Sequence, residues 1–247
     1  MKNLHIVPSY LTTVRYGGPI VSVHGLCHAL VGKGHQVDVY TTLTAGDCDL
    51  DIDSGVRVDI DAVGVYYYPA TAPHRWYYSA QMSAALHANV HDYDIVHIHA
   101  LFLHPISTAA IAARRASIPY LVSPRGVLVH SLFEQRSHWL KSAWMATFGR
   151  RVLEQAAAVH VTSAPERDEI GAFKLKLARM IEIPNGTDAI LRATSNPPRD
   201  KNLVPFLGRL SWKKQIDRMI DAMVACPLLT LVVVGNDDEG LLPSLCA

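Results

Sequence analysis

Cations gather at a turn late in the sequence, where an apolar run gives way to a helical pattern. The run LVPFL (203–207) is followed by Gly208 and Arg209, and Lys213 and Lys214 open the helical pattern. Arg presents a planar fork of donors and Lys a compact charge, and both suit phosphate oxygens beside a helix N-terminus. These residue types predict a diphosphate site that needs no metal. The alternative is a solvated basic loop.

A glycine turn, YGGP (16–19), follows the first apolar run, LHIVP (4–8). Gly17 and Gly18 let the backbone approach a ligand closely, and the helix that follows presents unpaired N–H groups to an anion. A tight turn before a helix is the simpler interpretation. The fingerprint G-x-G-x-x-G is absent, which argues against a nicotinamide enzyme.

Two histidines, His97 and His99, alternate in the apolar run DIVHIHA (94–100). On a strand they point to one face, and His99 lies nearer the carboxyl end, where ligands bind to parallel sheets. We expect His99 to contact substrate or to act in acid–base chemistry. A metal site would need further ligands, and the cysteines lack zinc spacing. We therefore expect no metal.

Arg125 stands in SPRG (123–126), directly after the apolar run YLVS (120–123). A loop arginine at this place can meet an anionic substrate or pair with a surface carboxylate.

A long helical pattern over about 135–155 carries an apolar stripe with basic neighbours. Its apolar members are four residues apart, and the two sets are Leu140, Trp144, Phe148 and Val152, with Lys141, Arg150 and Arg151. We interpret the stripe as part of the core. A face that lies on a membrane surface is the alternative.

Short apolar runs alternate with helical patterns along the chain. The expected strands are 4–8, 36–42, 56–60, 63–68, 94–100, 120–123, 157–163 and 180–184, and the expected helices begin near Val23, Ser79, 106, 135 and Pro165. Such alternation predicts an α/β fold with a parallel sheet covered on both faces. The loops after the strands are then the places to look for ligands.

The segment PNGTDAILRATSNPPRD (184–200) lacks a sustained period and marks a change of domain. We expect an N-terminal Rossmann-like domain over 1–187, a linker over 188–200 and a second, partial domain over 201–247. The last has only the strands 203–207 and 228–235 and the helix 214–225, too little apolar material to fold alone. We interpret the chain as a fragment of a longer protein.

The composition excludes several classes of protein. Of the 247 residues, 49 % are hydrophobic, and 23 Lys and Arg balance 22 Asp and Glu. There is no basic excess for nucleic acid, no signal-peptide pattern and no apolar run that spans a bilayer. We expect a cytoplasmic protein, with peripheral contact to the inner face of the membrane as an extension.

Taken together, the motifs resemble the group 1 (family 4) retaining glycosyltransferases. The resemblance runs along nearly the whole chain and lies in GGP, VGKGHQVDVYTT, DIVHIHALF, SPRGVL, VTSAPERDEI, IPNGTD, FLGRLSWKKQIDRMIDA and LLTLVVVGNDDEG. It implies a GT-B fold, in which the N-terminal domain receives the acceptor and the C-terminal domain holds the nucleotide-sugar.

The resemblance also assigns roles to particular residues. Arg209 and Lys214 match the pair that grips the donor diphosphate, and Gly17 and Gly18 match the glycine loop that approaches the same phosphates. His99 matches a histidine that lines the sugar pocket. Arg125 falls on the acceptor side.

The implied reaction moves a sugar from a UDP- or GDP-linked donor to a saccharide or lipid-linked acceptor. It needs no cofactor and suits the synthesis of a cell-surface polysaccharide. The family usually has Gly where this chain has Gln215, and its pair of spaced glutamates is missing. The alternatives are an inactive fragment that acts as a binding module and a GT-B-fold nucleotide-sugar epimerase.

Overall fold

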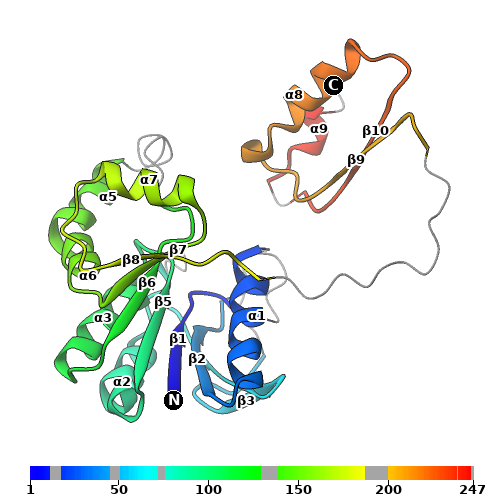
Figure 1. Ribbon diagram of the computed structural model, residues 1–247. Coiled ribbons are helices and arrows are strands. Elements are labelled where there is room, and N and C mark those ends of the chain that lie inside the picture. Colours follow the sequence, from blue (N-terminus) through cyan, green and yellow to red (C-terminus); the bar gives the residue numbers. More distant parts are fainter. Residues whose placement is uncertain are drawn as a thin grey trace. The chain divides into compact units, whose positions relative to one another are not determined.

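The computed structural model describes residues 1–11, 18–44, 51–71, 76–128, 138–186, 200–237 and 239–245 (Figure 1). The chain divides into two compact units, Met1–Asp188 (unit 1) and Ala189–Ala247 (unit 2). Most of the linker predicted at 188–200 lies outside the described residues.

Unit 1 is built on a sheet of eight described strands in the order β3-β4-β2-β1-β5-β6-β7-β8. These are β1 (Lys2–Ile6), β2 (Gln36–Thr42), β3 (Arg57–Ile60), β4 (Val63–Tyr68), β5 (Ile95–His99), β6 (Tyr120–Ser123), β7 (Ala158–Val161) and β8 (Met180–Glu182). All neighbours pair in parallel except β3 and β4, whose two-residue connection makes an antiparallel hairpin. The predicted parallel sheet is thus confirmed, with one antiparallel strand at its edge.

The helices of unit 1 cover both faces of the sheet (Figure 1). They are α1 (Gly18–Gly32), α2 (Ala80–Asn89), η3 (Val90–Asp92), α3 (His104–Arg115), α5 (His138–Trp144), the π-helical turn η4 (Met145–Gly149), α6 (Arg150–Glu154) and α7 (Ala164–Ala172). The right-handed crossovers between parallel strands explain which face of the sheet each helix covers. The β1–β2 step runs opposite to the steps from β4 through β8, so α1 packs in one apolar cluster and α2, α3 and α6 pack in another.

Several elements agree with the sequence residue for residue. The confirmed strands are 36–42, 63–68, 120–123 and 203–207. The predicted cap at Ser79 is also confirmed, because its hydroxyl accepts a hydrogen bond from the Met82 amide at 3.1 Å. These segments have the clearest apolar runs or capping residues.

The predicted helical stripe over about 135–155 does not form one continuous apolar face. Trp144 packs against the core and Val152 is buried, but half of Phe148 is exposed (50 %). The π-helical turn η4 is the reason, because its wider turn rotates the side chains that follow out of the four-residue register. Residues 129–137 lie outside the described part of the chain.

Unit 2 contains a parallel pair, β9 (Leu203–Leu207) and β10 (Thr230–Val234). The other elements are η5 (Trp212–Lys214), α8 (Ile216–Val224) and α9 (Leu242–Leu245). Ile216 of α8 is buried, whereas Leu207 and Val234 on the strands are 85 % and 53 % exposed. Among the described residues, the helices of unit 2 therefore leave apolar strand surface open.

The β3–β4 hairpin turns through Asp61 and Ala62, whose φ angles are 53° and 64°. Two positive φ values in a two-residue loop define a type I′ turn, which favours glycine at its second position. We therefore expect Ala62→Gly to raise the free energy of unfolding by about 1 kcal/mol, since an L-residue with a side chain is strained there. Urea denaturation measures the change.

Ala88→Gly, on the exposed surface of α2, is the matched control for this hairpin variant. The same substitution inside a helix should destabilise the chain by about 1 kcal/mol. A loss of stability in both variants would contradict the turn assignment.

Candidate active site

The carboxyl ends of the unit 1 strands border a cavity of about 540 Å³. The first turn of α1, the loop after β6, the start of α7 and a residue beyond β8 form its walls. Its lining residues are Pro19, Ser22, Arg125, Gly126, Thr162, Ser163, Pro165, Glu166, Glu169 and Asn185. Open parallel sheets bind ligands at this edge, so the cavity is the candidate ligand site of unit 1.

Arg125 is the cation of this cavity. It is half-buried, and its backbone has φ 54°, a left-handed conformation that residues with side chains seldom adopt. Its Nη1 donates to the Ser22 hydroxyl at 3.1 Å and to Asn185 Oδ1 at 2.8 Å, and its Nε donates to His99 Nδ1 at 3.2 Å. Segments far apart in the sequence therefore hold the guanidinium in one orientation.

His99, the predicted substrate contact, ends β5 and is only 1 % exposed. A guanidinium only donates, so Nδ1 of His99 must accept from Arg125, and the neutral ring carries its proton on Nε2. This Nε2 lies 3.0 Å from Nδ1 of His5, which accepts. Both ring nitrogens of His99 are therefore engaged inside the protein.

A second chain of hydrogen bonds begins at the carbonyl of Ile183, which can only accept. His160 Nε2 donates to it at 2.9 Å, so His160 Nδ1 accepts from the Ser123 hydroxyl at 2.7 Å. The Ser123 oxygen in turn accepts from His97 Nε2 at 2.7 Å. The predicted shared face of His97 and His99 is confirmed, with ring centroids 4.1 Å apart.

The imidazoles of His5, His97 and His99 are held neutral. Burial, reinforced by the positive charge of Arg125, lowers the pKa of His5 to about 3. Burial first, and then the neighbouring histidines and Arg125, hold the pKa values of His97 and His99 well below the ordinary 6.5. Neutral rings are what both hydrogen-bond chains require.

The ring nitrogens of His5, His97 and His99 lie within 4.8 Å of one another, a spacing that suits a metal ion. The hydrogen bonds argue for a different arrangement. A metal-ligating histidine donates from its second nitrogen, whereas that nitrogen of His99 accepts from the cationic Arg125. The expectation of no metal stays a prediction.

Glu166 joins two walls of the cavity. The sequence Ser163-Ala164-Pro165-Glu166 begins α7, and the Ser163 hydroxyl caps the helix by accepting from the Glu166 amide at 3.4 Å. The buried Glu166 carboxylate accepts from the Gly126 amide at 2.7 Å and from the amide and hydroxyl of Thr162 at 2.7 and 2.9 Å. It therefore fixes the loop that carries Arg125 against α7.

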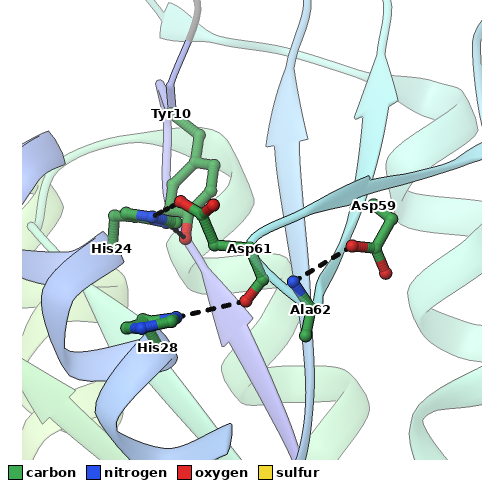
Figure 2. Close-up of polar contacts among 6 residues, drawn as sticks. All are labelled: Tyr10, His24, His28, Asp59, Asp61 and Ala62. Atoms are coloured by element: carbon green, nitrogen blue, oxygen red, sulfur yellow. Dashed lines mark hydrogen bonds and ion pairs between the residues drawn. The ribbon is translucent and has the colours of Figure 1, made fainter.

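The helix α1 is anchored to the β3–β4 turn by side chains that Figure 2 shows together. The Asp61 carboxylate accepts from His24 Nε2 at 2.9 Å, so His24 Nδ1 accepts from the Tyr10 hydroxyl at 2.9 Å. Burial raises the pKa of Tyr10, which keeps that hydroxyl a donor. His28 Nδ1 adds a hydrogen bond to the Asp61 carbonyl at 3.2 Å. Gly18 begins the anchored helix, while Gly17 lies outside the described residues.

In unit 2, Arg209 and Lys214 both belong to the segment between β9 and α8, and both are exposed. The segment is tied to the neighbouring strand, because the Gly208 amide donates to the Val234 carbonyl at 2.9 Å. Gly235 has φ 159°, and a Cβ there would lie 1.8 Å from the Gly208 carbonyl oxygen. Glycine is thus required where the two backbones meet beside Arg209.

Gln215, the departure from the family pattern, has φ 52° and ψ 44°. This left-handed conformation lets η5 turn directly into α8, and glycine adopts it without strain. The usual glycine of the family therefore has a conformational reason at this position.

Sequence reasoning missed several groups of the site. His160 is the single polar residue of the buried strand AVHV, and that was the available sign. His5 shares the strand KNLHI with Lys2 and Asn3, so the sequence did not single it out. Ser22 and Asn185 carry no local sign, because they meet Arg125 across 103 and 60 residues of chain.

The parallel sheet of unit 1, with its ligand cavity at the carboxyl edge, and the second parallel pair define an α/β protein of the GT-B class. Sucrose-phosphate synthase from Thermosynechococcus elongatus has a similar fold, with a TM-score of 0.65 and 20 % identity over 97 % of this chain and 63 % of that one. Anabaena Alr3699/HepE in complex with UDP and glucose has a TM-score of 0.64 and 18 % sequence identity, over 100 % of this chain and 65 % of that one. The catalytic domain of starch synthase IV from Arabidopsis thaliana, bound to ADP and acarbose, has a TM-score of 0.62 and 15 % sequence identity, over 99 % of this chain and 70 % of that one.

The family model described as a glycosyl transferase 4-like domain matches residues 17–186. The chain therefore belongs to that family. A comparison with curated proteins finds no match. The chain spans 63 % and 65 % of the length of the first two solved structures named above.

The buried histidines predict a pH-dependent stability. In the unfolded chain each titrates near the ordinary 6.5, whereas in the fold the pKa values of His5, His97 and His99 are lowered. The unfolded state then binds more protons below about pH 6.5, so stability is complete above that pH and falls as the pH falls toward the folded values. The loss should be about 1.4 kcal/mol per pH unit for each histidine.

Urea denaturation between pH 5 and 7.5 tests this slope, with His97→Gln as the comparison. Gln keeps a donor near the Nε2 position but does not titrate, so the slope of the variant should be shallower by about 1.4 kcal/mol per pH unit. Parallel pH profiles for the two proteins would contradict the assignment of a neutral, buried His97.

We expect Gly235→Ala to disrupt the loop that carries Arg209, because the new Cβ has no space beside the Gly208 carbonyl. Hydrogen exchange of the Gly208 and Leu210 amides, which donate to Val234 and Asn236, should become faster by 100-fold or more, for a local loss of about 3 kcal/mol. Gly171→Ala is the control, since its Cβ meets nothing within 4 Å. Equal protection in both variants would argue against the close approach.

Proposed function

We propose that this chain is part of a glycosyltransferase that moves a sugar, with retention, from a nucleotide-sugar to a saccharide or lipid-linked acceptor. Membership of the glycosyl transferase 4-like family supports the class of reaction. The observation that carries the donor side is the loop of Gly208 and Arg209, which sits at the carboxyl end of a parallel strand pair and is held by the contact with Gly235.

The donor diphosphate would bind to Arg209 and Lys214. Breaking the bond between sugar and phosphate leaves negative charge on the diphosphate, and preorganised cations stabilise that charge. The exposure of both side chains in unit 2 is compatible with this role. Gly18, which begins α1, and Gly17, which precedes it in the sequence, would let the backbone approach a donor phosphate. We assign no metal and no cofactor to the reaction.

The acceptor would enter the cavity of unit 1, where Arg125 lies. Polar groups on its wall, including Ser163 and Glu169, suit the hydroxyl groups of a saccharide. Two solved structures with similar folds are complexes with UDP and glucose and with ADP and acarbose, which supports a nucleotide-linked sugar as donor here.

We place the reaction in the synthesis of a cell-surface polysaccharide, in the cytoplasm and at the inner face of the membrane. Within the described residues, no helix has the length and apolar character needed to cross a bilayer. The membrane contact that we propose is peripheral. The exposed Trp139 and Phe148, beside the basic residues of α5 and α6, are where we would look for it.

Replacement of Arg209, the cation proposed to bind the donor diphosphate, tests the proposal. Arg209→Ala should lower the turnover of nucleotide-sugar by about 100-fold, the cost of losing one preorganised group at the developing charge. The assay follows nucleotide release from UDP-, GDP- and ADP-linked sugars by chromatography, with and without a chelator. Arg218→Ala, an exposed arginine of α8, is the control and should leave turnover unchanged.

Undiminished turnover in Arg209→Ala would overturn the role assigned to this residue. A chain that binds UDP or GDP in calorimetry without turnover would instead be a binding module. Conversion of the sugar without transfer, seen by NMR of the products, would identify an epimerase.

A further inference from the structure

Within the part of unit 1 that the structure describes, Arg125 hydrogen-bonds only to neutral groups, although the Glu166 carboxylate lies near enough for its charge to act on Arg125. Its hydrogen-bond acceptors there are an imidazole, a hydroxyl and a side-chain amide oxygen, all neutral. The nearby Glu166 carboxylate is occupied by Gly126 and Thr162, and no described carboxylate forms an ion pair with Arg125. A half-buried guanidinium whose hydrogen bonds all go to neutral groups can still take an anion as a direct, charge-assisted partner.

The geometry also shows which edge of the guanidinium is left for that anion. Nε is used by His99, and the two protons of Nη1 are used by Ser22 and Asn185. Among the described residues, Nη2 donates no hydrogen bond. Because Arg125 lines the 540 Å³ cavity, a ligand in the cavity can reach this nitrogen.

His99, at the end of β5, holds the guanidinium of Arg125 in its orientation. It accepts from Nε of Arg125, and its own ring is held by its Nε2 proton, which it donates to His5. Removing the acceptor at His99 would release the guanidinium to rotate about its long side chain. Removing the acceptor at His5 would release the ring of His99.

We propose that His99 and His5 are positioning residues, which hold Arg125 so that its Nη2 binds an oxyanion in the unit 1 cavity. The oxyanion is a phosphate or a carboxylate of the bound substrate. This inference rests on the proposed function only for the identity of that substrate. His99 then acts through Arg125.

NMR of the chain with ¹⁵N-labelled histidine tests the hydrogen bonds directly. Long-range ¹H–¹⁵N spectra should show the proton of His99 on Nε2, and Arg125→Met should abolish this preference for one tautomer. A proton on Nδ1 of His99 in the unchanged chain would overturn the proposal, because Nδ1 would then be unable to accept from Arg125.

A rescue series separates positioning from a general structural role. In His99→Asn the amide oxygen takes the place of Nδ1 and still accepts from Arg125, whereas His99→Leu offers no acceptor. Affinity for inorganic phosphate and for acetate, followed through the Arg125 Nε–H resonance, should fall about 10- to 100-fold in His99→Leu and stay within about threefold in His99→Asn. His5→Asn and His5→Leu form a second pair with the same expected order.

Phosphate and acetate distinguish the two kinds of oxyanion. Tighter binding of phosphate would indicate a phosphate group on the substrate, and tighter binding of acetate would indicate a carboxylate. Equal loss in Asn and Leu variants that keep the native spectrum would overturn the positioning role. Absence of binding of either anion to the unchanged chain would overturn the site. Failure of the transferase assay alone, with tautomer and anion binding as expected, would count against the proposed function and leave this site in place.

Discussion

A guanidinium donates hydrogen bonds and never accepts them. This property of Arg125 sets the direction of the hydrogen bonds at the carboxyl ends of the unit 1 strands. Its hydrogen bond to His99 decides where the proton of that ring lies and, through it, what His5 must do. The rings tolerate burial because they stay neutral. A polar site can thus sit on the face of a buried sheet without unsatisfied charge below it.

Hydrogen-bond directions are set in the same way wherever one group of a chain can only accept. The Ile183 carbonyl can only accept, so it orders His160, Ser123 and His97 in turn. The Asp61 carboxylate accepts from His24 and thereby makes Tyr10 a donor (Figure 2). The first chain joins neighbouring strands, and the second joins the β3–β4 turn to α1, whose first turn lines the cavity. The walls of the cavity are therefore supported by directional contacts as well as by apolar packing.

Unit 2 positions its cations by a different means. Gly235 lets one backbone lie against the carbonyl of Gly208, and the amides on either side complete the contact. The Glu239 carboxylate then holds the same segment by accepting from the Ser211 hydroxyl at 2.9 Å and from the Trp212 amide at 3.2 Å. The left-handed Gln215 then turns the chain into α8 within one residue. The backbone of this turn is therefore fixed by contacts within unit 2.

The sequence by itself determined the alternation of strands and helices, the place of the loops that follow the strands, and the chemical type of Arg125, Arg209 and Lys214. These properties depend on periodicity and residue type, which are local. Only the tertiary structure decided that His99 is turned inward, that Ser22 and Asn185 hold Arg125, and that η4 rotates Phe148 out of the core stripe. The physical reason is that the direction of a hydrogen bond depends on partners that the fold brings together from distant parts of the chain, and no local pattern records which partners will meet.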